Sequence, residues 1–421
     1  MSESEFGTEQ YDVLIAGGGM VGASLACALG NSGLKVALIE PADFPQAPAI
    51  DDPYGLRVSA ITLASQCIFQ NLGVWDTIKA NRISPFREMH TWDAGGDGRI
   101  HFDSAEIGEA TLGHIIENQL IQAALYQRCR DFENIDIIQQ NAVQLYEVGE
   151  DQVDLQLKSG MELKTRLLVG ADGRDSDIRK LAGIATTGWE YQQTAVVASV
   201  TPEKPHQETA WQRFLSSGPL AFLPLGNGDC SIVWSTTPDE ANRLLELPED
   251  EFCQQLEDAF ESKLGKILHT GSRAAFPLRL QHATDYVKPR IALVGDAAHA
   301  IHPLAGQGVN LGLLDAATLA EVLLQSVEQG KDPGAYGVLR RYERWRKGEN
   351  LSMMFAMDGF KKVFGSDIAP VRLLRNMGLN FADQVVPLKN QIMIRAMGLQ
   401  GDFPALARKN AAAAFDLNHE A

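Results

Sequence analysis

The chain has 421 residues, of which 45% are hydrophobic and 22% charged, a composition typical of a globular protein with room for two or three domains. Its formal net charge of −17 argues against a nucleic-acid partner, because such binding depends on Lys and Arg displacing counterions from phosphates. No apolar run approaches the roughly 18 to 20 residues of a membrane span, and the acidic residues 2–5 do not resemble a secretory signal, so we expect a cytoplasmic protein.

Cysteine and histidine usage gives no sign of a metal centre. The 5 cysteines form no C-x-x-C pair, and the 9 histidines form no H-x-x-x-H or H-E-x-x-H arrangement. We therefore predict no metal site and no disulfide framework, with the cysteines reduced and mostly buried.

The chain begins with a predicted βαβ unit. An apolar strand at Tyr11–Ala16 leads through a glycine cluster into a helix of small residues from Met20 to about Asn31, and a second strand follows at Lys35–Glu40. Further helices are predicted at Ile61–Leu72 and Glu117–Arg130, and three short β-rich runs lie between residues 135 and 170.

From about Ile184 to Thr237, strands separated by turn residues predict an antiparallel sheet in a domain of its own. A helix near Glu249–Leu264 and a strand near Ala274–Leu280 lead to a buried strand, Arg290–Val294, that returns to the first domain. Beyond Gly308 the pattern is helical almost to the end. The first domain is therefore predicted to be discontinuous.

The glycine cluster has the G-x-G-x-x-G spacing of a dinucleotide-binding turn. Gly17 permits the tight turn, Gly19 lets a pyrophosphate approach the backbone, and Gly22 lets helix and strand pack closely. Glu40 ends the second strand, where a carboxylate can accept hydrogen bonds from a ribose. These features predict dinucleotide binding but do not distinguish FAD from NAD.

Two later motifs distinguish them: Gly170-Ala171-Asp172-Gly173-Arg174 and Gly295-Asp296-Ala297-Ala298-His299 each follow an apolar strand. With the glycine cluster, this order resembles the flavoprotein hydroxylases related to p-hydroxybenzoate hydroxylase. The resemblance implies that FAD is the cofactor, that Asp172 and Asp296 belong to its site, and that Asp296 bonds the ribityl chain.

The same resemblance can be compared at two other positions, Arg57 and Asn118. Arg57 matches an arginine that the family places near the FAD. Asn118 departs from the family, which often has Arg or Gln there, so the sequence assigns it no role.

The implied fold class is α/β: a Rossmann-like FAD-binding domain, an inserted antiparallel-sheet substrate domain, and a helical C-terminal region. The predicted boundaries are 8–80, 104–183 and 285–345 for the FAD-binding domain, 81–103 and 184–284 for the substrate domain, and 346–421 for the C-terminal region.

The segment His302–Gly312 is similar to the characteristic segment of ubiquinone-biosynthesis hydroxylases. Pro303 and the glycines shape a loop that can lie flat against a ring system, and the backbone N–H groups of Gly308, Val309 and Asn310 are suited to stabilise negative charge on a reduced flavin. The resemblance implies reduction of FAD by NADH or NADPH, formation of a flavin C4a-hydroperoxide with O2, and oxygen transfer to a phenolic ring.

No catalytic acid or base follows from the sequence. His299 and His302 flank this region, but a histidine beside a Gly-Asp turn more often makes a structural hydrogen bond than transfers protons. We therefore name no catalytic side chain.

Local likenesses favour the bacterial branch that hydroxylates 2-polyprenylphenols at C5. They occur at Leu56–Ile61, Leu72–Trp75, Leu112–Asn118, Cys230–Ser235 and Arg340–Arg344. Hydroxylation at C1 or C6, a flavin-dependent isoprenoid reductase, and a non-catalytic flavin scaffold are the alternatives.

Residues 349–409 carry eight basic and five acidic side chains, a local charge of +3 in an acidic protein, and are rich in Met and Phe. The region is predicted either to dock on the inner membrane or on other ubiquinone-pathway proteins, or to be a helical cap on the FAD-binding domain. A homo-oligomer is also left open.

Overall fold

The computed structural model describes residues 9–300, 307–366 and 368–409. The predicted βαβ unit is confirmed: β1 (Glu9–Ala16) and β2 (Val36–Glu40) are parallel neighbours joined by α1 (Met20–Ala28). The helix ends before the predicted Asn31, because that residue has a left-handed φ of 56° that an α-helix does not allow.

This unit lies within an eight-stranded sheet of order β17-β18-β11-β1-β2-β8, with β10 beside β11 and β9 beside β10. The added strands are β8 (Ile135–Gln139), β9 (Val143–Val148), β10 (Val153–Leu157), β11 (Glu162–Gly170), β17 (Val287–Lys288) and β18 (Ile291–Leu293). The three predicted β-rich runs are thus four strands. The late strand β18 returns to this sheet as predicted and runs parallel to β11.

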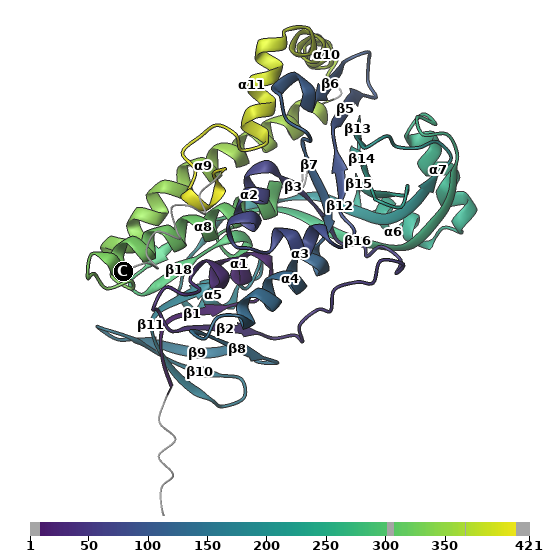
Figure 1. Ribbon diagram of the computed structural model, residues 1–421. Coiled ribbons are helices and arrows are strands. Elements are labelled where there is room, and N and C mark those ends of the chain that lie inside the picture. Colours follow the sequence, from purple (N-terminus) through teal and green to yellow (C-terminus); the bar gives the residue numbers. More distant parts are fainter. Residues whose placement is uncertain (1–8, 301–306, 367, 410–421) are drawn as a thin grey trace, which may run out of the picture.

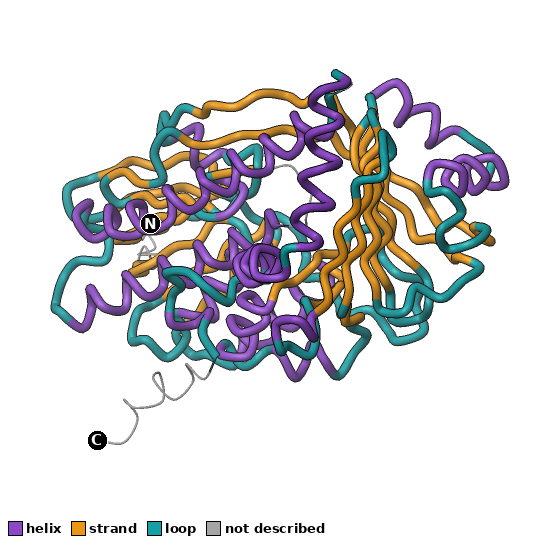
Figure 2. The backbone as a smooth tube through the Cα atoms, turned by 90° about the horizontal axis from the view of Figure 1, so that it is seen from above, coloured by secondary structure: helices purple, strands orange, loops and turns teal. Residues whose placement is uncertain are grey.

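A second eight-stranded sheet has the order β19-β16-β12-β15-β14-β13-β5-β6. Figure 2 shows the strands in two separate groups, one for each large sheet. Its strands are β5 (Glu88–Asp93), β6 (Arg99–Asp103), β12 (Thr186–Pro202), β13 (Thr209–Leu215), β14 (Gly218–Pro224), β15 (Cys230–Thr236), β16 (Ile267–Ala283) and β19 (His299–Ala300). Neighbours are antiparallel except β13 and β5, which are parallel. The antiparallel sheet is confirmed, while the exact domain boundaries stay predictions.

Two helices, α6 (Pro238–Glu246) and α7 (Glu249–Ala259), cover the outer face of this second sheet (Figure 1). Helix α6 is absent from the elements predicted above, although its signal is present: the Thr237 hydroxyl caps the helix and Pro238 lies in its first turn. The predicted helix near residue 249 ends earlier than expected, because Glu261 and Ser262 have positive φ values.

A three-stranded sheet, β3-β7-β4, lies between the two large sheets (Figure 1). Its strands and nearby helices are β3 (Val58–Thr62), α2 (Leu63–Asn71), α3 (Trp75–Lys79), β4 (Ser84–Phe86), η1 (Ser104–Ile107), β7 (Gly113–Glu117) and α4 (Asn118–Arg130). The helix predicted from Ile61 begins at Leu63, because Thr62 ends strand β3 and its side chain caps the helix.

Beyond Gly308 the predicted helical pattern is confirmed by α8 (Gln307–Glu328), α9 (Tyr336–Phe364), α10 (Ala369–Gln384), α11 (Val386–Ala396) and η3 (Ala405–Ala407). Two short helices lie earlier in the chain, α5 (Asp177–Leu181) and η2 (Gly295–Ala297). Helix α8 packs against α1 and α9, whereas α10 lies beside β6 (Figure 1). In the part of the chain that the structure describes, no helix combines the length and apolarity needed to cross a membrane. All five cysteines are buried and none is in a disulfide.

Candidate active site

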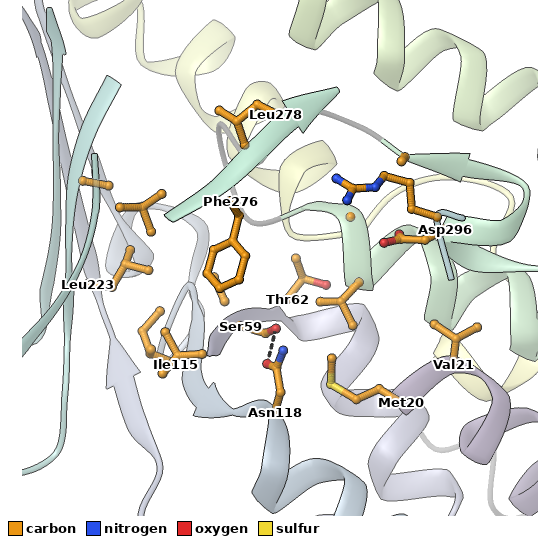
Figure 3. Close-up of a pocket in the computed structure, with 18 of the residues that line it drawn as sticks. Met20, Val21, Ser59, Thr62, Ile115, Asn118, Leu223, Phe276, Leu278 and Asp296 are labelled. Atoms are coloured by element: carbon orange, nitrogen blue, oxygen red, sulfur yellow. Dashed lines mark hydrogen bonds between the residues drawn. The ribbon is translucent and has the colours of Figure 1, made fainter. Parts of the chain in front are cut away.

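A cavity of about 580 Å³ lies between the first sheet's loops and the second sheet. One end is formed by the glycine turn, the Gly-Asp turn after β18 and the start of α8; the other is formed by the second sheet, β7 and the end of α11. Figure 3 shows Asp296 and Val21 at the first end and Leu223 and Ile115 at the other. The cavity thus joins dinucleotide-binding loops to an apolar wall.

The glycine turn has the geometry that a pyrophosphate requires. Gly17 has a φ of +105°, and a Cβ there would lie 2.4 Å from the carbonyl oxygen of Ala171. A Cβ on Gly22 would lie 1.9 Å from the Gly17 oxygen, so this glycine serves the packing of α1. Gly19 lines the cavity and has open space within 4 Å of an added Cβ, next to the N-terminus of α1. Gly17 is therefore required by the turn and Gly22 by the packing of α1, whereas the open space at Gly19 fits a bound phosphate.

Glu40 braces the same turn. Its Oε2 accepts a hydrogen bond from the backbone N–H of Gly18 at 2.7 Å, and its Oε1 accepts one from Ala42 at 3.1 Å. A carboxylate can accept further bonds, so the predicted ribose contact stays a prediction. Whatever its ligand, Glu40 fixes the loop that carries Gly19.

Asp172, by contrast, serves the protein scaffold. Its carboxylate accepts hydrogen bonds from the Ser176 hydroxyl and from the backbone N–H groups of Asp177 and Ile178, at the start of α5. The parts of this motif that line the cavity are Ala171, Gly173 and Arg174. A direct contact of Asp172 with the cofactor stays a prediction.

The late Gly-Asp turn brings a carboxylate to the cavity. Gly295 has a φ of +59° and packs against Val21 of α1, while Asp296 is exposed and lines the cavity (Figure 3). Desolvation by the surrounding protein raises the pKa of Asp296, although the charges of His299 and Arg174 oppose the rise. An accessible carboxylate here fits the predicted role of accepting hydrogen bonds from the hydroxyls of FAD.

The first turn of α8 also reaches the cavity. Gly308 and Val309 line it, and N–H groups in the first turn of a helix have no partner within the helix. The Asn310 side chain is buried: its Oδ1 accepts bonds from the Thr62 N–H and the Ser65 hydroxyl, and its Nδ2 donates to the Ala60 carbonyl. Asn310 therefore anchors α8 to β3 and α2.

Pro303, predicted to shape the adjoining loop, lies outside the described residues, as does His302.

Two polar groups from the small sheet and α4 meet at the cavity. The Ser59 hydroxyl donates to Asn118 Oδ1 at 2.6 Å, and both residues line the cavity (Figure 3). Asn118, to which the sequence assigned no role, therefore belongs to the site. Arg57 is exposed and lies over the ring of Phe276, 5.0 Å from its centroid, and that phenylalanine lines the cavity.

The apolar wall follows the alternation of the second sheet. On β14, Ala221 and Leu223 line the cavity, whereas Leu220 and Phe222 point to the opposite face and pack under α6 and α7. Within the apolar run Leu220–Leu223, only every second residue therefore faces the cavity. Among the described residues that line the cavity, the ionisable ones are Arg174, Arg279 and Asp296.

A buried ionic network, which no sequence pattern indicates, holds the Gly-Asp turn against α8 and α9. Asp315 of α8 accepts hydrogen bonds from His299 Nε2 at 2.5 Å, Arg346 Nε at 2.8 Å and the backbone N–H of Gly295 at 3.1 Å. Burial alone would raise the pKa of Asp315, but His299 and Arg346 hold it at about 2. His299 is 1% exposed and does not line the cavity, so its observed contact is structural.

Three side chains with metal-ligand chemistry lie together on the second sheet. Glu88 and His90 share one face of β5, and His101 lies opposite His90 on β6, with their ligand atoms within 4.8 Å of one another. Hydrogen bonds from both imidazoles to Glu88 already join them. Met89, on the other face of β5, lines the cavity, so the cluster lies outside it. Sequence spacing could not reveal a pairing across two strands.

The open space at Gly19, the accessible carboxylate of Asp296 and the first turn of α8 all lie along one end of the cavity. This arrangement fits a dinucleotide whose ring system faces the apolar wall.

Comparison with known proteins gives the same result. Residues 10–348 match the FAD binding domain family. The chain is 38% identical to "Ubiquinone biosynthesis monooxygenase COQ6, mitochondrial" of Danio rerio, over 91% of this chain and 89% of that protein. It is 37% identical to the 3-demethoxyubiquinol 3-hydroxylase of Escherichia coli (92% and 98%) and 39% identical to ubiquinone hydroxylase UbiL of Rhodospirillum rubrum (92% and 89%).

Solved structures share the fold. The p-nitrophenol 4-monooxygenase PnpA of Pseudomonas putida superposes with a TM-score of 0.76 at 19% identity, over 94% of this chain and 100% of that chain. PqsL of Pseudomonas aeruginosa gives 0.73 at 21% identity, over 89% and 100%. The predicted fold class and the FAD cofactor are therefore confirmed, and the chain belongs to the family of FAD-dependent monooxygenases that includes the ubiquinone-biosynthesis hydroxylases.

Proposed function

We propose that this protein hydroxylates the ring of a polyprenylated phenol in ubiquinone biosynthesis, at C5, with electrons from NADH or NADPH and one oxygen atom from O2. In the overall reaction, NAD(P)H supplies two electrons as a hydride and solvent supplies a proton; one oxygen atom of O2 enters the ring as a hydroxyl group, and the other leaves as water. The observation that carries the proposal is the cavity that joins the FAD-binding loops to an apolar wall.

We assign different functions to the residues at the two ends of the cavity. FAD, when bound, supplies the exchange of electrons with the nicotinamide and the activation of O2. Asp296 and the first turn of α8 hold and orient it, and the Ser59–Asn118 pair provides polar groups beside it. Phe276, Leu278 and Leu223 present apolar surface to an aromatic ring and keep water away from it.

The substrate class is supported by the named functions of three relatives, all of which concern ubiquinone. The choice of C5 depends on the local sequence likenesses at residues 56–61, 72–75, 112–118, 230–235 and 340–344. Hydroxylation at C1 or C6 is the alternative, and the name of the Escherichia coli relative specifies ring position 3.

The deciding experiment incubates the purified flavoprotein with NADH or NADPH, a short-chain 2-prenylphenol and isotopically labelled O2. We expect one labelled oxygen in the ring, at C5 by NMR of the product. Labelled product at another position would overturn only the choice of C5. Unlabelled product would overturn monooxygenation, and a product with a reduced isoprenoid double bond would favour the reductase.

A further inference from the structure

Helix α10 has its polar face buried and its apolar face exposed. Arg375 and Asn376 are buried, whereas Leu373, Leu374, Met377 and Phe381 are each at least 59% exposed. A surface helix ordinarily buries its apolar stripe, so this orientation is the reverse of the usual one.

The second sheet explains why the polar face is inside. Strand β6 is the last strand of that sheet, and a free edge leaves backbone N–H groups without partners. Asn376, Asn380 and Asp383, one turn apart along α10, accept hydrogen bonds from the backbone N–H groups of Gly98, Arg99 and His101. The helix therefore completes the edge of the sheet with its own side chains.

A buried ion pair fixes the helix in this position. Arg375 donates two hydrogen bonds to Asp93 of β5, at 2.7 and 2.9 Å, and a third to the Phe364 carbonyl at the end of α9. A Cβ on Gly98 would lie 2.3 Å from Asn376 Oδ1, so the turn before β6 needs glycine for the helix to approach. The outward direction of the apolar face is thus determined by specific contacts.

The outer face, as we call Leu373, Leu374, Met377 and Phe381 of α10 with Leu388 and Ile392 of α11, has positive neighbours. Arg372 and Arg395 are exposed, and neither forms an ion pair with any described residue. The described acids of these helices and of the second half of α9 are engaged: Asp358 pairs with Lys362, and Asp383 accepts the His101 N–H. This apolar and cationic surface, on a protein of net charge −17, complements an anionic lipid headgroup layer.

The outer face is also continuous with the cavity. Leu388, Ile392 and Ala396 are spaced four residues apart on one side of α11. The first two are about 40% exposed, whereas Ala396, with Met397 after it, lines the cavity. An apolar stripe therefore leads from the surface to the site.

We propose that the outer face docks on an anionic lipid bilayer, so that the apolar chain of the substrate can pass from the bilayer along α11 into the cavity. The route of the substrate rests on the proposed function; the docking does not. In this arrangement α10 and α11 lie against the headgroups, and the acidic remainder of the protein faces away from them.

Vesicle flotation tests the docking on the FAD-loaded protein without substrate. Wild type should float with vesicles containing phosphatidylglycerol, less with pure phosphatidylcholine, and less at high salt. The triple variant Leu374→Gln, Met377→Gln, Phe381→Gln should lose at least tenfold in vesicle partition. The control variant, Leu145→Gln, Met161→Gln, Leu268→Gln, changes three apolar side chains elsewhere that are 48–62% exposed, and it should float like wild type.

A charge-reversal variant tests the electrostatic part of the docking independently. Arg372→Glu should weaken partition into anionic vesicles by roughly fivefold or more. The proposal is overturned if wild type does not float, or if the triple variant floats equally well. It is also overturned if sedimentation velocity shows a dimer that the triple variant abolishes and that vesicles do not compete with, because the face would then contact a second copy. Hydroxylation of a short-chain phenol should be unchanged in the triple variant, and an inactive wild type that still floats would count against the proposed function alone.

Discussion

Nε2 of His299 and Oδ2 of Asp315 lie 2.5 Å apart, and neither side chain has any exposed surface. The contact joins β19, which follows the Gly-Asp turn, to α8, whose first turn lines the same end of the cavity. Arg346 of α9 completes the network through the other carboxylate oxygen.

We expect Asp315→Asn to lower the free energy of unfolding by about 3–5 kcal/mol, because it leaves the buried guanidinium of Arg346 without a compensating charge. Urea denaturation measures the change. The control Asp177→Asn removes the exposed Lys180 partner and should cost less than about 1 kcal/mol. Similar losses in the two variants would contradict the assigned role.

Acid should destabilise the protein in two ranges of pH. Burial lowers the pKa of His282 and of His114 from 6.5 to about 4. The unfolded chain binds protons near pH 6.5 while the folded protein does not, so stability is present above pH 6.5 and is lost as the pH falls towards 4. For Asp315 the pKa falls from 3.8 to about 2, so its contribution is lost between those values.

Urea midpoints measured from pH 7.5 to 4 should therefore decrease, and His282→Gln should make the decrease shallower. An unchanged slope in this variant would show that His282 does not contribute to it.

Gly19→Val should give a folded but colourless protein, because the added side chain meets open space in the protein and occupies the position of the pyrophosphate. Gly22→Ala is the contrasting variant: its Cβ would meet the Gly17 carbonyl oxygen at 1.9 Å, so it should lose stability. Circular dichroism and the flavin absorbance separate the two effects. A yellow Gly19→Val protein would place the phosphates elsewhere.

Asp296→Ala should weaken FAD binding by about tenfold to a hundredfold, the worth of a hydrogen bond to a charged group. Fluorescence titration of the apoprotein with FAD measures this change. Asp175→Ala, which removes an exposed carboxylate directly after the Gly170–Arg174 motif, should leave the affinity unaltered. Equal retention of FAD by the two variants would remove Asp296 from the site.

Ala221→Leu should impair substrate binding and leave FAD binding intact, because the added atoms project from β14 into the apolar end of the cavity. We expect the KM for a prenylphenol to rise about tenfold, corresponding to about 1.4 kcal/mol of lost binding. Leu220→Met, on the opposite face of the same strand, is the control. An unchanged KM would place the substrate elsewhere.

The sequence by itself determined the turns that form one end of the cavity. Gly17, Gly19, Gly22 and Asp296 could be predicted because their roles depend on backbone conformation next to a strand end, and that requirement leaves a local pattern. The same holds for the βαβ unit and the antiparallel sheet, whose periodicities are local. For Glu40, Arg57, Asp172 and Asp296 the contacts with FAD stay predictions, and the structure shows that Asp172 accepts hydrogen bonds from backbone N–H groups at the start of α5.

Only the tertiary structure decided the contacts between distant segments. Nothing local in the sequence pairs Asp315 with His299, Arg375 with Asp93, or His90 with His101. Likewise, α10 has an ordinary amphipathic pattern, from which burial of its apolar side would be expected. The free edge of β6 reverses the orientation of the helix. The backbone N–H groups of that edge need acceptors, and the polar side of α10 supplies them.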